Sequence, residues 1–212
     1  MIRALLFDIG NVIVPVEPRR AWDLLAPHCP LTWDVARRRL FASEEAVRFE
    51  CGALSPDEFL AGAARLLEIQ APTDVLREAW CSMFGEGTLL PAPLFASLAR
   101  SHRLVLVSNT NVLHFEAHRV AWPHFGYFHA AVLSYRAGCR KPAREFFEQA
   151  VAAAQCPAQE CLYIDDSQEY VTAARALGIP GIVFTGEAAL RSELDRRGVP
   201  LESAQKSAPG SS

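Results

Sequence analysis

The sequence predicts an α/β protein in which a parallel sheet carries helices on both faces and an all-helical unit is inserted behind the first strand. Two observations support this fold class. Short β-rich segments that are apolar almost throughout alternate with segments of helical periodicity, as in parallel sheets that are buried on both faces. One long region shows helical periodicity alone. The expected strands lie at residues 2–7, 103–108, 130–134, 161–165 and 181–185.

The helices that follow the last three expected strands can be placed from their apolar spacing and their end signals. After Pro142, apolar residues recur at helical spacing from Phe146 to Ala154. A helix expected at 169–178 ends on a glycine, and so does one expected at 187–198. Glycine often ends a helix because it adopts the left-handed conformation without strain. We expect these helices to cover the sheet.

Residues 16–85 interrupt the alternation, because they contain helical periodicity and no convincing strand. Within them, Ser55 and Glu58 form a capping-box pattern, with Pro56 at the first helical position. A helical insertion after the first strand is typical of a cap that covers a site at the strand ends. The expected units are an α/β core of residues 1–15 and 86–200, a helical cap of residues 16–85, and a disordered tail of residues 201–212.

The composition argues against several classes of protein. The 212 residues are 50% hydrophobic and carry a formal net charge of −3. They can build a sizeable core, but they offer no basic surface for nucleic acid or for an anionic membrane. No apolar run reaches the roughly 18 residues of a membrane-spanning helix, and the N-terminus lacks the features of a signal peptide. We expect a cytoplasmic protein that acts on a small molecule, and its oligomeric state is left open.

Polar side chains stand where the expected strands end. Asp8 follows the first strand, Ser108 ends the second, and Lys141 lies beyond the third. The fourth strand ends in the pair Asp165 and Asp166. Because ligands of open α/β sheets bind outside the carboxyl ends of the strands, we expect these side chains to form one site.

These residue types suit phosphoryl transfer. Clustered carboxylates repel one another unless a cation lies between them, and Mg²⁺ prefers carboxylate oxygens and water as ligands. A serine hydroxyl and a lysine can hold the oxygens of a phosphate dianion, together with backbone donors near Asn109. An aspartate beside the metal and the phosphate is a plausible nucleophile. Lys141 is one of only two lysines among 21 basic residues, which indicates that a compact point charge is needed there.

Taken together and in this order, the four segments resemble the four motifs of the haloacid dehalogenase superfamily. The resemblance covers about residues 1–195 and implies a Rossmann-like parallel core with a helical cap of the C1 type. From motif I to motif IV, the matching residues are Asp8, Ser108, Lys141 and the pair Asp165 and Asp166.

Smaller details resemble a narrower branch of that superfamily, the sugar-phosphatase-like group, similar to bacterial α-glucose-1-phosphate phosphatases. The first detail is D-x-G-N, which starts at Asp8, and the second is S-N-T-N-x-L-H, which starts at Ser108. The third is E-x-G-x-[IL]-S, which runs from Glu50 to Ser55 in the expected cap.

The resemblance implies a Mg²⁺-dependent hydrolase of phosphate monoesters, with a sugar phosphate as the favoured substrate. Asp8 would be the nucleophile and would form an aspartyl-phosphate. Ser108, Asn109 and Lys141 would hold the phosphoryl group. The metal would bind Asp8, Asp166 and the main-chain carbonyl of Gly10, and Asp165 would share the metal or lie behind it.

Two residues depart from the family pattern. Most phosphatases of the superfamily have an aspartate two positions after the nucleophile, where it protonates the leaving group and then activates water. Gly10 stands there in this chain and can do neither. The loss of a general acid typically lowers the rate by about 10²–10⁴-fold. Tyr170 stands where the narrower branch usually has an asparagine, four residues after Asp166.

Two other functions stay open. One is a metal-independent, dehalogenase-like hydrolase, since those enzymes also lack the aspartate at the position of Gly10. The adjacent acids Asp165 and Asp166 argue against it, because without a cation they would repel a halocarboxylate. The other is a binding protein that has kept the fold and lost turnover.

Several histidines and tryptophans are expected to have no catalytic part. His114 and His118 are four residues apart, but they do not match the H-E-x-x-H zinc motif and no third ligand is evident. We expect them on the surface of a helix. The four tryptophans are expected to pack in the core or the cap; they are Trp22, Trp33, Trp80 and Trp122.

Overall fold

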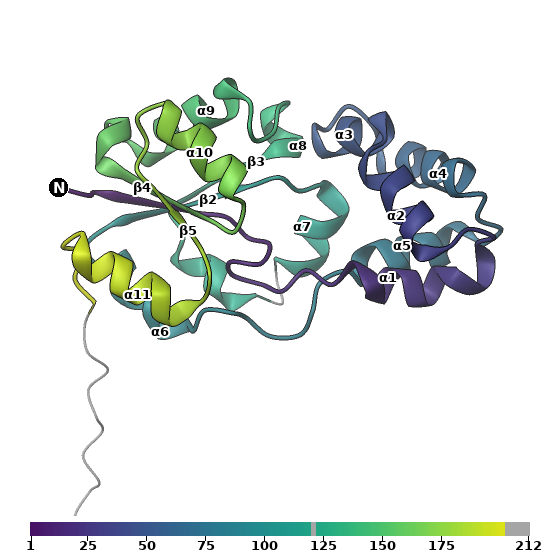
Figure 1. Ribbon diagram of the computed structural model, residues 1–212, viewed down its shortest axis with the longest axis horizontal. Helices are drawn as coiled ribbons and strands as arrows, with labels where there is room; N and C mark the ends of the chain where they lie inside the picture. The colour runs from purple at the N-terminus through teal and green to yellow at the C-terminus, as the bar shows by residue number, and fades with distance from the viewer. Residues whose placement is uncertain (120–121, 202–212) are drawn as a thin grey trace, which may run out of the picture.

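The computed structural model describes residues 1–119 and 122–201. Its centre is a sheet of five parallel strands in the order β3-β2-β1-β4-β5 (Figure 1), which confirms the predicted fold class. All five expected strands form; two have the expected bounds, and each of the other three is one or two residues shorter at one end. The strands are β1 (Ala4–Phe7), β2 (Arg103–Ser108), β3 (Ala130–Leu133), β4 (Cys161–Asp165) and β5 (Gly181–Val183).

The register of the sheet brings the strand ends together. Phe7, the last residue of β1, pairs with Leu106 on β2 and with Ile164 on β4. The amide of Asp8 continues this pairing, donating to the carbonyl oxygen of Ile164 at 2.9 Å. Asp8 therefore leaves the sheet from its central strand, beside Asp165 on one neighbouring strand.

Helices cover both faces of the sheet because the β1 side chains alternate between two apolar clusters. Leu5 and Phe7 pack on one side with α6 and α11, while Ala4 and Leu6 pack on the other with α9 and α10 (Figure 1). Among the described residues, no helix is long and apolar enough to cross a membrane. The helices that follow the cap are α6 (Ala92–Ala99), α7 (Val112–His118), α8 (Ser134–Ala137), α9 (Arg144–Ala154), α10 (Gln168–Ala176) and α11 (Glu187–Arg196).

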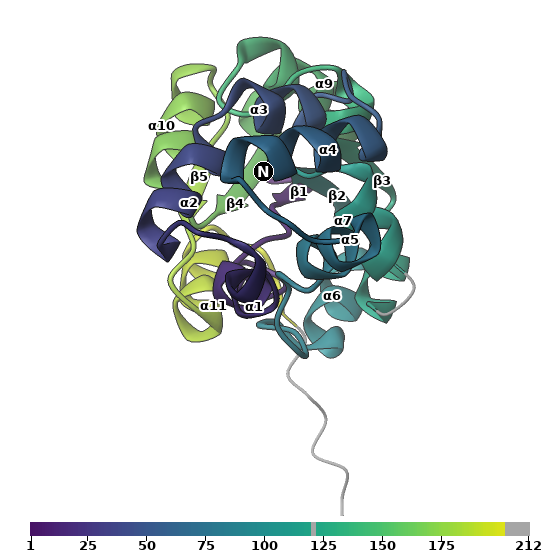
Figure 2. The ribbon, with the colours of Figure 1, turned by 90° about the vertical axis from the view of Figure 1, so that its right-hand side faces the viewer.

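Five helices inserted between β1 and β2 share an apolar cluster of their own, which includes Phe49, Phe59 and Trp80. They stand together beyond the carboxyl ends of the strands (Figures 1 and 2). The capping box at Ser55 is formed, with hydrogen bonds in both directions between Ser55 and Glu58. We call these helices the cap; they are α1 (Pro18–Leu25), α2 (Trp33–Phe41), α3 (Glu44–Glu50), α4 (Pro56–Leu67) and α5 (Thr73–Cys81).

The two segments that join the cap to the core run side by side. Val16 and Phe84 form an antiparallel bridge, and the amide of Gly85 donates to the carbonyl oxygen of Pro15 at 2.9 Å. The expected boundaries of the cap fall on this pair of segments, and the division into domains stays a prediction. The predicted disordered tail lies outside the described residues, except for Leu201, which packs against the core.

A buried hydrogen-bond network joins cap helix α5 to core helix α7, and it corrects our expectation for His114. His114 is buried because its ring stacks on Trp80 of the cap. Its Nε2 lies 2.9 Å from the carbonyl oxygen of Trp80 and its Nδ1 lies 3.1 Å from Nδ2 of Asn111. A carbonyl only accepts, so Nε2 carries the proton and Nδ1 accepts from the amide of Asn111. His118 is half-buried and contacts the carbonyl oxygen of Cys81 at 2.8 Å.

A second contact between cap and core lies at the loop behind α3. Gly52 has a φ of +72°, and a Cβ atom at this position would stand 2.1 Å from the carbonyl oxygen of Tyr135 on α8. Only glycine allows both this backbone conformation and this close approach. The loop is therefore seated directly on the core backbone.

The burial of His114 predicts a pH-dependent contribution to stability. Burial lowers the pKa of His114 from 6.5 to about 3. The unfolded chain binds this proton more readily, so the contribution is complete above pH 6.5 and declines as the pH falls towards 3. His114→Gln should be less stable than the wild type at pH 7.5, and the difference should shrink at acidic pH by up to about 1.4 kcal/mol per pH unit.

Urea unfolding of both proteins at pH 7.5 and pH 4.5 measures this difference. Leu98→Ala serves as a control, because it removes a buried apolar side chain of α6 and no titrating group. Its loss of stability should be similar at the two pH values. An equal His114→Gln deficit at both values would contradict the buried, neutral imidazole.

Candidate active site

The side chains expected to form the site meet at the carboxyl edge of the sheet. Nζ of Lys141 lies 3.0 Å from Oδ1 of Asp8 and 2.6 Å from Oδ2 of Asp165. Asp166 belongs to the same group, since one carboxylate oxygen from each of the three aspartates lies within 4.8 Å of the others. Ser108 is buried at the end of β2, next to the carbonyl of Val107 that Lys141 also contacts.

Lys141 is enclosed by acceptors. Its side chain is 1% exposed, and its third contact is the carbonyl oxygen of Val107 at 3.3 Å. The three protons of the ammonium thus have three acceptors. Burial alone would lower the pKa of Lys141, but the carboxylates of Asp8 and Asp165 outweigh that effect and raise it. The lysine is therefore held as a cation that binds Asp8 on one side and Asp165 on the other.

The backbone of Lys141 is held by Asn109. The amide of Lys141 donates to Oδ1 of Asn109 at 2.8 Å, and Nδ2 of Asn109 donates back to the carbonyl oxygen of Lys141 at 3.1 Å. The side chain of Asn109 is thereby committed to the lysine loop. A phosphate contact from Asn109, as the sequence predicted, could come from its backbone amide or from the second hydrogen of Nδ2.

Asp165 has a full set of protein partners. Besides Lys141, the hydroxyl of Tyr163 donates to its Oδ2, and the amide of Ser167 donates to its Oδ1 at 2.8 Å. Both oxygens are therefore occupied and the side chain is fully buried. This arrangement favours the alternative in which Asp165 lies behind the metal rather than sharing it, and it places Asp165 where it can orient Lys141.

Asp8 and Asp166 are better placed to hold a cation. Burial raises the pKa of Asp8 to about 6 in spite of Lys141, and burial also raises the pKa of Asp166. If Asp8, Asp165 and Asp166 are all ionised, three negative charges and the single positive charge of Lys141 leave a net charge of −2. A divalent cation bound by these oxygens would balance that charge, so the donor set fits Mg²⁺.

The turn behind Asp8 offers one more oxygen. In the part of the chain that the structure describes, the carbonyl oxygen of Gly10 accepts no hydrogen bond. The nearby amides of Asn11 and Val14 donate instead to the carbonyl oxygens of Val14 and Ile9. Asn11 has a φ of +53°, a conformation that asparagine tolerates better than most residues. Its Nδ2 donates to Oδ2 of Asp166 at 3.2 Å, which joins motif I to motif IV.

Tyr170 contributes to the lysine's surroundings. Its ring centroid lies 5.1 Å from Nζ of Lys141, and that of Tyr163 lies 5.8 Å away. Aromatic rings at such distances attract a cation through their negative faces. The residue that departs from the family pattern is thus a wall of the site beside Lys141.

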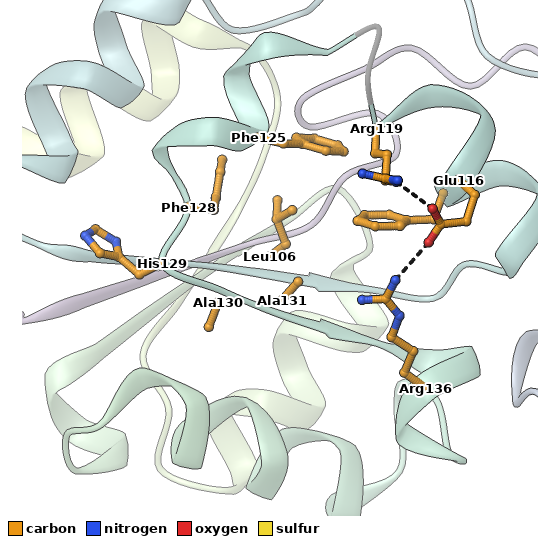
Figure 3. Close-up of a pocket in the computed structure, with 10 residues that line it drawn as sticks. Leu106, Glu116, Arg119, Phe125, Phe128, His129, Ala130, Ala131 and Arg136 are labelled. Atoms are coloured by element: carbon orange, nitrogen blue, oxygen red, sulfur yellow. Dashed lines mark hydrogen bonds and ion pairs between the residues drawn. The ribbon is translucent and has the colours of Figure 1, made fainter.

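A separate cavity of about 490 Å³ lies beside β2 and β3 and does not include this cluster (Figure 3). The carboxylate of Glu116 stands between the guanidinium groups of Arg119 and Arg136 and bonds to both. The remaining lining is largely apolar, including Phe125 and Phe128. None of the strand-end residues contributes to its lining, so the cavity is distinct from the candidate active site.

Sequence reasoning missed three polar partners of the cluster. Tyr163 lies two residues before Asp165 on β4, and residues two apart share a face of a strand, so this spacing could have revealed it. Asn11 belongs to the D-x-G-N pattern but was not assigned a role. Arg140, which precedes Lys141, pairs with Glu50 of the cap at 2.6 Å. No local pattern indicates that last contact.

Several known proteins resemble this chain in sequence or in fold. The chain is 26% identical over 202 residues to D-ribitol-5-phosphate phosphatase of Bacteroides thetaiotaomicron, covering 92% of this chain and 97% of the relative. A predicted HAD-like family hydrolase of Porphyromonas gingivalis has a similar structure, with a TM-score of 0.80 and 22% identity over 93% of this chain and 98% of that one.

A HAD family enzyme of Bacteroides thetaiotaomicron, solved with magnesium and inorganic phosphate, has a TM-score of 0.73 and 23% identity, covering 88% of this chain and 96% of that one. Both structures establish the fold. The narrower resemblance to α-glucose-1-phosphate phosphatases stays a prediction. The model of the haloacid dehalogenase-like hydrolase family matches residues 2–178, so this chain belongs to the haloacid dehalogenase-like hydrolases.

Proposed function

We propose that this hydrolase is a Mg²⁺-dependent phosphatase of a small phosphorylated metabolite, with a sugar or polyol phosphate favoured. The observation that carries the proposal is the pairing of Lys141 with Asp8 and Asp165 beside Asp166. This group combines a nucleophile, a fixed cation and spare negative charge for a metal. The D-ribitol-5-phosphate phosphatase to which the chain is 26% identical supports the same reaction class.

The metal would be held by Asp8, Asp166 and the carbonyl oxygen of Gly10. When bound, Mg²⁺ would neutralise charge on the phosphoryl oxygens and lower the repulsion between a phosphate dianion and the carboxylate of Asp8. Asp165 acts through Lys141, because its two oxygens are already engaged. The protein supplies the remaining steps through its own side chains.

In the proposed reaction, a carboxylate oxygen of Asp8 attacks phosphorus while the bond from phosphorus to the leaving oxygen breaks. The hydroxyl of Ser108 would bind one phosphoryl oxygen during the transfer, and Lys141 would exchange one of its three protein acceptors for another. The product of this step is an aspartyl-phosphate on Asp8 and an alcohol that has gained a proton from water. A second water then attacks phosphorus, which releases inorganic phosphate and restores the carboxylate.

Gly10 makes the leaving group important. It supplies a carbonyl for the metal but no acid for the departing oxygen, so a substrate with a good leaving group should react more readily than an alkyl ester. The cap of residues 16–85, as we propose to divide the chain, would limit access of water and select the alcohol. The metal-independent, dehalogenase-like alternative is disfavoured by the net charge of −2, which would repel a halocarboxylate.

Mg²⁺ should stabilise the folded protein. At a hundredfold excess over its dissociation constant, a ligand of the native state raises the free energy of unfolding by about 2.7 kcal/mol. Thermal unfolding should therefore shift upward with MgCl₂ and much less with NaCl of equal ionic strength. Asp166→Asn should lose most of the difference, because it removes one ligand charge. An equal response to both salts, or an unchanged response in Asp166→Asn, would count against the metal site.

Asp8→Asn should abolish turnover while the protein stays folded, because an amide cannot attack phosphorus. Steady-state hydrolysis of p-nitrophenyl phosphate with Mg²⁺ measures this, with circular dichroism to establish folding. Asp195→Asn changes an exposed aspartate on α11 in the same way and should leave the rate unchanged. Retained activity in Asp8→Asn would rule out the assigned nucleophile.

A chelator should remove activity from the wild type, because the proposed reaction requires Mg²⁺. Activity that survives chelation would favour the dehalogenase-like alternative.

Restoring an acid at position 10 should raise the rate on poor leaving groups. A Cβ atom at Gly10 would stand 2.9 Å from Cγ2 of Val16, so the test requires Gly10→Asp combined with Val16→Ala. Relative to Val16→Ala alone, the double variant should hydrolyse an alkyl phosphate faster, by up to about 10²–10⁴-fold, with little change on p-nitrophenyl phosphate. A gain that is absent, or equal on both substrates, would contradict the missing-acid argument.

If none of these proteins hydrolyses a phosphate ester and phosphate still binds to them, the chain would be the binding protein instead.

A further inference from the structure

We propose that Glu50 is the cap residue that recognises the alcohol part of the substrate, accepting a hydrogen bond from one of its hydroxyl groups. The substrate class that follows is a phosphate monoester of an otherwise neutral, polyhydroxylated alcohol. This inference rests on the proposed phosphatase function and deepens it.

The position of Glu50 is fixed from both sides. It is the last residue of α3 in the cap, and its Oε2 lies 2.6 Å from Nη1 of Arg140 in the core. Arg140 immediately precedes Lys141, whose ammonium bonds to Asp8. Two residues beyond Glu50, Gly52 is seated against the carbonyl of Tyr135. The carboxylate is therefore held at the seam between cap and core, in contact with the residue that precedes Lys141.

Glu50 lies beside the lysine loop, because its carboxylate pairs with Arg140 at 2.6 Å. Burial raises its pKa, while the charges of Arg140 and of Lys141 both lower it. Lys141 has the same lowering effect on the pKa values of Asp8 and Asp166. Of the carboxyl groups that respond to Lys141 in this way, Glu50 is the one contributed by the cap.

One oxygen of Glu50 is available to a ligand. Oε2 is paired with Arg140, whereas Oε1 has no hydrogen bond within the described residues. The side chain is 25% exposed and that of Arg140 is 31% exposed, so the pair can be reached by a small molecule. The core acids have other tasks, since Asp165 is fully engaged and Asp8 and Asp166 are reserved for phosphorus and metal.

The chemistry of a fixed carboxylate defines the class of substrate. An ionised carboxylate accepts hydrogen bonds and cannot donate them, so it selects a hydroxyl donor. It also repels a second phosphate or carboxylate on the same molecule. Because the cap lies beyond the strand ends (Figure 1), Glu50 would contact the alcohol while Lys141 and Ser108 hold the phosphoryl group.

The test compares substrates that differ only in hydroxyl groups. For Glu50→Gln, kcat/KM with D-ribitol 5-phosphate should fall roughly tenfold to hundredfold, as for one hydrogen bond to a charged group, and mainly through KM. Pentyl phosphate has the same carbon chain without hydroxyls, and p-nitrophenyl phosphate has none either. Both should keep their kcat/KM within about threefold, as expected for a change away from the reacting atoms.

Glu68→Gln is the matched control, because Glu68 pairs with Arg39 inside the cap at 3.1 Å and does not reach the core. It should leave all three substrates unchanged. If Glu50→Gln does not fold, Glu50→Asp keeps the charge on a shorter side chain, and it should lose activity selectively on ribitol 5-phosphate.

Three outcomes would overturn the proposal. An equal fall on all three substrates would show that Glu50 only holds the cap closed through Arg140. An unchanged preference for ribitol 5-phosphate would show that another residue recognises the hydroxyls. A wild-type protein that hydrolyses p-nitrophenyl phosphate but prefers pentyl phosphate over the polyol would refute the substrate class while leaving the phosphatase function intact. A wild type that hydrolyses none of the three would instead overturn the proposed function.

Discussion

The ammonium of Lys141 lies between the carboxylates of Asp8 and Asp165, out of contact with solvent. A buried charge is tolerated only where partners surround it, and removing one partner of such a pair typically costs about 3–5 kcal/mol. The neighbouring structure supplies those partners. The carbonyl oxygen of Val107 accepts the third hydrogen bond of the ammonium, and the side chain of Asn109 holds the backbone of Lys141. Tyr163 and the amide of Ser167 donate hydrogen bonds to the carboxylate of Asp165. These contacts leave the carboxylate of Asp8 at the carboxyl edge of the sheet in a fixed orientation, as nucleophilic attack on phosphorus requires.

Much of this arrangement could be predicted from the sequence, because few rules are needed to reach it. Apolar runs too continuous for a one-sided sheet indicated parallel strands, and parallel strands place their carboxyl ends on one edge. That was sufficient to bring Asp8, Ser108 and Asp165 together before any contact was known. Lys141 could be singled out by its rarity in an arginine-rich chain. The register of β1 with β2 and β4 places the carboxyl ends of these strands at the same edge, as that rule predicts.

The contacts between cap and core were beyond reach for a physical reason. Helical periodicity tells which face of a helix is apolar, but not which surface will cover it. His114 was expected on a surface for that reason, and it is buried because α5 of the cap packs on α7. The pairing of Glu50 with Arg140 joins residues 90 positions apart. Asn109 was expected to help bind the phosphate through the backbone, but no local pattern indicated that its side chain holds the lysine loop, which depends on three-dimensional distances.

We propose that Asp8, oriented by Lys141, becomes covalently phosphorylated during turnover. The most direct measurement stops the reaction with acid while the enzyme hydrolyses p-nitrophenyl phosphate with Mg²⁺, reduces the protein with borohydride, and identifies the modified residue by mass spectrometry. An acyl phosphate should be trapped on Asp8, its reduction should leave homoserine at that position, and Asp8→Asn should show neither. Turnover with no modification at Asp8, or with the phosphoryl group on a different residue, would contradict this proposal.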